Sequence, residues 1–246
     1  MFNFVHMKPS ITSYIKFSFQ FNTEKLLQDL TIASKNTWIL HFNTGGYEGD
    51  WKVISLYAPN GEANNIFAHS TENAVLKETP ILGQCLYFKE VISFFKAPIL
   101  SARILKLSPQ AVIKPHRDYQ LGYENGCFRI HIPITTNMDV SFILNDNSLK
   151  MLPGECWYTN VNFIHSVANM GTTDRVHLVL DFERNEWSDA LFFSMAPEES
   201  FRPMPLDNES PEMMRSTIAS LKQSNFPIAK ELIATLTEKL RRLEGN

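Results

Sequence analysis

Alternation between apolar and polar positions predicts a strand near the start of the chain. Residues 14–21 read YIKFSFQF, with an aromatic or aliphatic side chain at every second position, which is typical of a strand with one buried face. From residue 22 the spacing becomes helical, and Asn22 or Thr23 is expected to cap a helix that ends near residue 34. The same criteria predict strands at 38–42 and 51–57 and a helix at 84–95.

Short apolar runs separated by turn residues fill the middle of the chain. Pairs such as Asn125-Gly126 and Pro153-Gly154 interrupt these runs at nearly regular intervals. Because no helical pattern lies between the runs, a parallel α/β sheet is excluded and a mainly β sandwich or jelly roll is favoured. The predicted strands are 102–107, 112–116, 128–133, 140–144, 155–159, 165–168 and 175–181.

After residue 181 the sequence contains several prolines and then a helical pattern. Residues 227–243 place leucine and isoleucine on one face, which predicts an amphipathic helix. We expect this face to pack on its own domain, with a homodimer through the C-terminal helix as the alternative. The chain then divides into an N-terminal α/β elaboration (1–98), a β core (99–182) and a helical C-terminal extension (183–246).

Composition and charge narrow the class of protein. The chain has 246 residues, a net charge of −3 and three cysteines. The absence of a basic stripe makes nucleic acid an improbable partner, and no apolar run has the roughly 20 residues that a membrane helix needs. Because the cysteines form no CxxC pair and their number is odd, neither a disulfide framework nor a thiolate zinc site is expected. A cytoplasmic location is the expectation.

The motif KPHRDY carries the first candidate chemistry. His116 and Asp118 are two residues apart, so on a strand both side chains would point to one face. His165, 49 residues beyond His116, is the natural third ligand, since that spacing accommodates several short strands. Two histidines and one carboxylate form the facial triad that binds non-haem Fe(II) and leaves coordination positions open.

Two apolar strands also direct cationic groups to one face. Arg175 lies in DRVHLVLDF, and Arg129 and His131 alternate with apolar residues in FRIHIPI. A buried arginine requires an anion, so Arg175 either pairs with Asp181 or Glu155 or clamps a ligand carboxylate. Together these groups suit a dicarboxylate such as 2-oxoglutarate.

The other histidines have less specific interpretations. His177 shares the face of Arg175 and is assigned to the substrate side of the site, with an ordinary core histidine as the alternative. His6, His41 and His69 lie outside the β block and are expected at the surface.

The region 102–187 resembles the aspartyl/asparaginyl β-hydroxylase family of Fe(II)/2-oxoglutarate-dependent dioxygenases, and also the bacterial L-proline cis-hydroxylases. The motifs that carry the resemblance occur in the family's order: PHRD, RIHIPI, PGECW and HSVANMGTTDRVHLVLD. The resemblance implies a double-stranded β-helix (jelly roll, cupin-like) core with flanking helices.

The resemblance also implies roles for the residues in these motifs. His116, Asp118 and His165 would bind iron, Arg175 would hold the distal carboxylate of 2-oxoglutarate, and Arg129 and His131 would assist the carboxylate nearer the metal. This chain departs from the vertebrate-type members, which have glycine in place of the Asp118 carboxylate and a serine where Leu105 stands here.

The expected function is hydroxylation of an unactivated C–H bond of an amino acid. The reaction would consume 2-oxoglutarate and O₂ and form succinate and CO₂ as coproducts. The amino acid would be free, peptidyl or bound to a carrier protein. Substrate contacts are assigned to His177, Arg103 and Trp51, with Lys106 and Arg117 as further candidates. The competing hypotheses are a non-oxidative cupin-like metalloprotein, such as an isomerase or sensor, and a metal-free β-sandwich interaction module.

Overall fold

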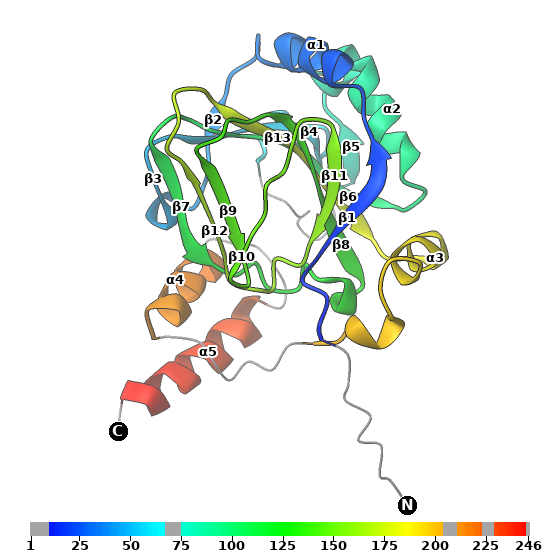
Figure 1. The fold of residues 1–246 in the computed structure, drawn as a ribbon. Coiled ribbons are helices and arrows are strands. Elements are labelled where there is room, and N and C mark those ends of the chain that lie inside the picture. Colours follow the sequence, from blue (N-terminus) through cyan, green and yellow to red (C-terminus); the bar gives the residue numbers. More distant parts are fainter. Residues whose placement is uncertain (1–9, 67–74, 204–210, 223–228, 245–246) are drawn as a thin grey trace, which may run out of the picture.

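Two antiparallel β-sheets face each other and form a flattened barrel, as the computed structural model shows (Figure 1). The structure describes residues 10–66, 75–203, 211–222 and 229–244. The mainly β, jelly-roll expectation is confirmed. Among the described residues, no helix is long and apolar enough to cross a membrane.

The larger sheet has eight strands in the described part of the chain. Its spatial order is β1 (Tyr14–Gln20), β11 (Glu155–Thr159), β8 (Cys127–Thr135), β13 (Arg175–Glu183), β6 (Ile99–Leu107), β4 (Trp51–Pro59) and β2 (Ile39–Leu40), with β5 (Leu76–Glu78) paired to β4. The smaller sheet has the order β10 (Asn147–Ser148), β9 (Val140–Leu144), β12 (His165–Asn169), β7 (Ala111–His116) and β3 (Tyr47–Glu48). Strands from residues 1–98 thus hydrogen-bond into both sheets, next to strands of the predicted core.

Both faces of the larger sheet are buried, for different reasons. One face packs against the helices α1 (Thr23–Ala33), α2 (Leu86–Phe94) and α3 (Glu186–Phe193), which cover it in Figure 1. Alternate residues of β8 and β13, such as Ile130 and Leu178, join this outer core. The intervening residues face the barrel interior, where Val53, Leu107 and Phe142 form a second core. Strand alternation therefore places the polar residues of β8 and β13 inside the barrel.

Most sequence-predicted elements occur within a few residues of their expected limits. Asn22 caps α1 by accepting a hydrogen bond from the Lys25 amide. The strand predicted at 38–42 is shorter, since β2 ends at Leu40 and a 3₁₀ turn occupies Thr44–Gly46.

The C-terminal region contains more helix than the sequence predicted. A capping box at Asn185 starts α3, and α4 (Pro211–Lys222) begins at a proline, which suits the first helical turn because that turn has no partner for its amides. The predicted amphipathic helix is α5 (Ala229–Glu244); its expected start at 227 lies outside the described residues.

The two last helices pack on each other at one end of the barrel. Leu236 of α5 is buried against Met214 and Ile218 of α4. In turn α4 contacts β7 and the 3₁₀ turn at Thr44–Gly46. This packing covers part of the apolar face of α5 within the chain. It also brings α4 to the end of β7 that carries His116.

Candidate metal centre

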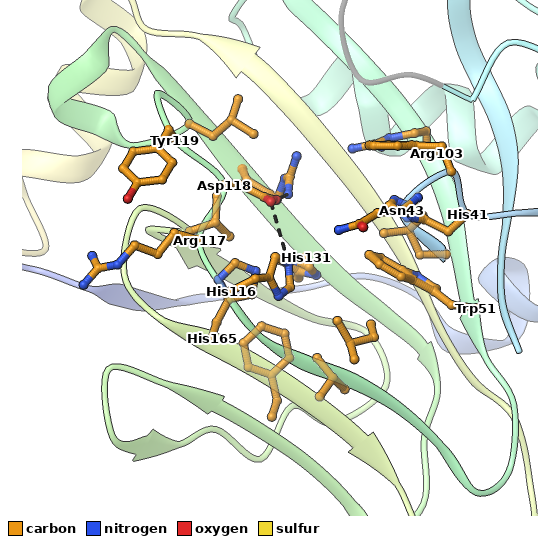
Figure 2. A pocket seen from close by; sticks show the side chains of 18 of the residues that line it. His41, Asn43, Trp51, Arg103, His116, Arg117, Asp118, Tyr119, His131 and His165 are labelled. Carbon is orange, nitrogen blue, oxygen red and sulfur yellow. Dashed lines mark hydrogen bonds and ion pairs between the residues drawn. The ribbon is translucent and has the colours of Figure 1, made fainter. Parts of the chain in front are cut away.

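Three potential metal ligands converge where β7 and β12 lie side by side. His116 is the last residue of β7 and pairs directly with His165, the first residue of β12. The strand ends at His116, as the predicted strand 112–116 does, so Asp118 stands on the following loop and does not share a strand face with His116. The Asp118 amide donates to the Val161 carbonyl at 2.9 Å, which returns its carboxylate to the site. One ligand atom from each of His116, Asp118 and His165 lies within 4.8 Å of the others (Figure 2).

Both imidazoles are oriented by backbone carbonyls. His116 Nδ1 lies 2.8 Å from the Lys114 carbonyl oxygen, and His165 Nδ1 lies 3.0 Å from the Phe163 carbonyl oxygen. Because a carbonyl only accepts, each Nδ1 must carry the proton, which leaves each Nε2 lone pair for a metal. Burial, reinforced by His116, lowers the pKa of His165 to about 3, so this ring is neutral as a ligand must be.

Asp118 is held as a carboxylate by its neighbours. Burial raises its pKa, but the Arg129 guanidinium and the imidazoles of His116 and His165 outweigh burial and hold the pKa well below its ordinary value. Arg129 Nη1 donates to Asp118 Oδ2 at 2.6 Å. The other oxygen, Oδ1, lies 3.7 Å from His116 Nε2. Two imidazoles with Nε2 directed to one point and one ionised carboxylate, with open space beside them, fit the facial-triad donor set for Fe(II).

A buried ion network fixes Arg129 behind Asp118. Asp181, 1% exposed, accepts from Arg129 Nε at 2.7 Å and from Arg129 Nη2 at 3.1 Å. Arg103 Nη2 donates to the same carboxylate at 3.3 Å. All three side-chain nitrogens of Arg129 are therefore engaged by Asp118 and Asp181. Arg129 thus holds the Asp118 carboxylate in position.

Replacing Asp181 with asparagine is expected to lower the free energy of unfolding by about 3–5 kcal/mol, because two buried guanidinium groups lose their counter-charge. Urea unfolding of the metal-free protein measures this change. The control is Asp50→Asn, which breaks the exposed pair with Lys52 and should cost less than about 1 kcal/mol. Equal effects of the two substitutions would show that the network is not a stabilising unit.

Arg175 is a buried cation without a carboxylate partner among the described residues. It is 2% exposed, and burial lowers its pKa to about 9. The alternative that it pairs with Asp181 or Glu155 is wrong, since Asp181 pairs with Arg129 and Arg103, and Glu155 pairs with Lys16. Its Nη2 lies 2.9 Å from His177 Nδ1, and its Nε has no hydrogen-bond partner in the described part of the chain.

His131 is a second buried group to which the described residues offer no hydrogen-bond partner. Neither ring nitrogen forms a hydrogen bond, although the side chain is 6% exposed. Burial, together with the charge of Arg175, keeps its pKa well below the ordinary value, so the ring is neutral. Unpaired buried polar groups cost on the order of 1–3 kcal/mol each. Arg175 and His131 thus form a site that an anionic ligand would complete.

One cavity connects the metal ligands to these unpaired groups. Its volume is about 120 Å³, and both the triad and Arg175 lie on its wall. Trp51, Leu105 and Phe142 supply apolar wall, while Thr217 of α4 borders it from the C-terminal region. The Thr217 hydroxyl is buried and has no hydrogen-bond partner within the described ranges.

The sequence-predicted residues, Arg117 included, meet in this cavity with two exceptions, His177 and Lys106, and Lys106 pairs instead with Asp174. His116, Asp118, His165, Arg175, Arg129, His131, Arg103 and Trp51 all line it. His177 is buried but borders a different cavity, which it shares with Arg175.

The expectation of a surface position for His41 is wrong. His41 is 7% exposed, and its ring stacks on Trp51 with 3.5 Å between ring centroids (Figure 2). The His41 amide donates to the Trp51 carbonyl at 2.8 Å, which extends the β2–β4 pairing by one residue. Only that long-range pairing brings His41 to the cavity. His6 and His69 lie outside the described residues.

Three buried neutral imidazoles outside the triad predict an acid-sensitive fold. Burial lowers the pKa of His41, His131 and His177 well below 6.5. As pH falls through 6.5 the unfolded chain binds protons on these rings and the folded protein does not, so stability is lost. Between pH 7.5 and 5.5 the metal-free protein is expected to lose about 1.4 kcal/mol per ring, about 4 kcal/mol for these three, and His165, whose pKa is lowered to about 3, adds a similar amount per ring. Urea unfolding at the two pH values measures this, and His131→Phe should remove about 1.4 kcal/mol of the loss. A stability that is flat across this range would contradict the prediction.

Comparison with known proteins gives a consistent set of similarities. The model of the aspartyl/asparaginyl β-hydroxylase family matches residues 20–185. The L-proline cis-4-hydroxylase of Rhizobium meliloti (strain 1021) is 28% identical over 160 residues, which cover 63% of this chain and 56% of that protein. The L-proline cis-3-hydroxylase 2 of a Streptomyces species is 24% identical over 157 residues, which cover 59% and 54%. The chain thus spans little more than half the length of these curated relatives.

A solved structure shares the fold. The crystal structure of an oxidoreductase of the 2OG-Fe(II) oxygenase family from Burkholderia pseudomallei superposes with a TM-score of 0.51 over 70% of this chain and 86% of that chain. At 14% sequence identity this likeness concerns the fold alone.

Proposed function

Because this chain belongs to the aspartyl/asparaginyl β-hydroxylase family, we propose that it is a Fe(II)/2-oxoglutarate-dependent dioxygenase that hydroxylates an unactivated C–H bond of an amino acid. The observation that carries the proposal is Arg175, a buried cation without a carboxylate partner among the described residues, in the same cavity as a histidine–carboxylate triad. A non-oxidative cupin needs the triad but has no use for this arginine.

The metal would be held by His116 Nε2, His165 Nε2 and the Asp118 carboxylate. Bound there, Fe(II) supplies the activation of O₂ that couples decarboxylation of 2-oxoglutarate to hydroxylation, with succinate and CO₂ as coproducts. The chain's own contribution is geometric. The Lys114 and Phe163 carbonyls fix the two imidazoles, and Arg129 fixes the carboxylate.

The cosubstrate would span the cavity from the triad to Arg175. The Arg175 guanidinium suits its distal carboxylate, because bidentate charge-assisted hydrogen bonds would satisfy the unpaired Nε. His131 would donate to the carboxylate nearer the metal, with the positive charge of Arg129 beside it. Phe142, which lies 5.7 Å under the Arg175 guanidinium, would limit the access of water.

The amino-acid substrate would occupy the side of the cavity formed by Trp51, His41 and Arg103. Arg103 Nε is buried, finds no hydrogen-bond partner among the residues that the structure describes, and suits the substrate carboxylate. Thr217 of α4 would offer its hydroxyl to a polar group of the substrate. Because α4 borders the cavity, we propose a free amino acid rather than a carrier-bound one, and L-proline is the first compound to test.

A dimer is not required, since α5 packs on α4 within the chain. A reducing cytoplasm suits the three free, buried thiols.

Succinate formation by the Fe(II)-loaded protein tests the proposal. A panel of free L-amino acids is supplied with 2-oxoglutarate, and succinate and hydroxylated product are quantified by mass spectrometry. At least one amino acid should give the two products in equal amounts. Conversion of a panel compound without consumption of 2-oxoglutarate would instead support the cupin-type hypothesis.

A further inference from the structure

A second cavity lies behind Arg175, at the opposite end of the β8–β13 ladder from the metal ligands. Its volume is about 300 Å³. Arg175 opens β13 where β8 ends at Thr135, whereas the Arg129–Asp181 pair, which contacts Asp118, lies further along the same ladder. Only Phe142 and Arg175 line both cavities in the described part of the chain. We call this second space the rear cavity.

The floor of the rear cavity is cationic. Arg175 and His177 line it, both 2% exposed, and no aspartate or glutamate is among its described lining residues. His177 is neutral because burial, together with Arg175, lowers its pKa, and its Nδ1 accepts from Arg175 Nη2. Its proton is therefore on Nε2, a donor in addition to the unpartnered Arg175 Nε. A positive charge with N–H donors beside it favours the binding of an anion.

The walls and mouth of the rear cavity are mostly apolar, with Thr136, Asn137 and Lys150 as the other polar lining residues. Val140, Leu149 and Met151 line it, and the rim carries Met138 and Leu152, which are 82% and 54% exposed. A cavity of this volume holds about ten groups of the size of a water molecule, at about 30 Å³ each. A hydrated inorganic anion would leave these apolar walls in contact with water, whereas an aliphatic chain would pack against them and exclude water.

We propose that the rear cavity binds an unbranched aliphatic monocarboxylate of about eight carbons. The carboxylate lies against Arg175 and His177, and the chain runs along Val140 and Leu149 to the rim at Met138 and Leu152. One further consequence rests on the proposed function: because the cosubstrate also needs Arg175, the monocarboxylate competes with 2-oxoglutarate.

Calorimetric titration of the full-length, Mn(II)-loaded protein with butanoate, hexanoate and octanoate tests the site. Affinity should rise about fourfold for each added methylene, roughly 200-fold from butanoate to octanoate, because each methylene leaves water. Octanol, which lacks the carboxylate, should bind far more weakly than octanoate. Equal affinity of the three acids, or binding of octanol as tight as that of octanoate, would overturn the proposal.

Substitutions in the rear cavity locate the bound chain. Val140→Trp fills the cavity, and Leu152→Glu places a negative charge on the exposed rim, where folding is not at stake. Each should weaken octanoate binding at least tenfold. The control Leu86→Glu changes a leucine that is 74% exposed on α2, away from the rear cavity, and should leave binding unchanged. Unchanged octanoate binding in Leu152→Glu would refute the site even if Val140→Trp failed to fold.

Titration of 2-oxoglutarate separates this proposal from the proposed function. Leu152→Glu should bind 2-oxoglutarate as the wild type does, and octanoate should weaken 2-oxoglutarate binding in the wild type only. Loss of 2-oxoglutarate binding in Leu152→Glu would mean that the rear cavity is the cosubstrate's own site, which overturns the present proposal and leaves the dioxygenase intact. Octanoate binding without any 2-oxoglutarate binding would support the rear site and refute the proposed function.

Discussion

Replacing Arg175 with methionine is expected to weaken 2-oxoglutarate binding by roughly 30- to 4,000-fold, which corresponds to the 2–5 kcal/mol lost when one partner of a buried charged hydrogen-bonded pair is removed. The same substitution should make the ligand-free protein more stable. A buried cation without a counter-charge among the described residues is unfavourable, and exchange of buried charge for an apolar side chain of similar volume can stabilise a fold by about 1–4 kcal/mol. Part of this gain is offset because His177 Nδ1 loses its donor.

Calorimetry with Mn(II) and 2-oxoglutarate measures the first effect, and urea unfolding without ligand measures the second. The control is Arg241→Met on α5, where the arginine side chain is 78% exposed and both effects should be absent. A ligand-free Arg175→Met protein that is several kcal/mol less stable than wild type would show that Arg175 holds the fold together instead of serving a ligand.

Replacing Asp118 with alanine is expected to abolish metal-dependent stabilisation. Loss of a direct ligand should lower Mn(II) affinity by more than the 10- to 100-fold typical of residues that only support a ligand. The substitution also removes the carboxylate that Arg129 Nη1 contacts at 2.6 Å, so the positive charge of Arg129 is no longer compensated on the side of the metal. Equilibrium dialysis with quantified Mn(II) gives the affinity.

The control for Asp118→Ala is Asp139→Ala, an exposed aspartate in the turn before β9, which should retain wild-type affinity. Substitution of Arg129 by glutamine should have the intermediate effect of a supporting residue, since the carboxylate stays in place without its anchor. If Asp118→Ala binds Mn(II) as tightly as Asp139→Ala, the carboxylate is not a ligand.

The residues of the centre were predictable where local periodicity decides their direction. In β8 and β13 every second residue is apolar, so Arg129, His131 and Arg175 had to share the opposite face, and the structure places that face inside the barrel. His116 and His165 are ends of neighbouring strands, which the spacing of the β runs allowed.

Features that depend on long-range packing were not predictable. His41 enters the cavity only because β2 pairs with β4, and Thr217 only because α4 rests on the end of β7. The partner of Arg129 was not predictable either, because nothing in the sequence indicates that Asp181 pairs with Arg129 rather than with Arg175. The alternation of residues along a strand determines which face a side chain occupies. Which residue it contacts across the barrel depends on how the strands pair in the folded protein.

Thermal unfolding of the metal-stripped protein, with Mn(II) as a redox-inert substitute for Fe(II) and with or without 2-oxoglutarate, tests the central claim most directly. A ligand at 100 times its dissociation constant stabilises a protein by about 2.7 kcal/mol, which gives a readily measured rise in Tm. The predicted result is a rise with Mn(II), a further rise when 2-oxoglutarate is added, and loss of the second rise in Arg175→Met. A rise with Mn(II) that 2-oxoglutarate does not increase would contradict the dioxygenase assignment.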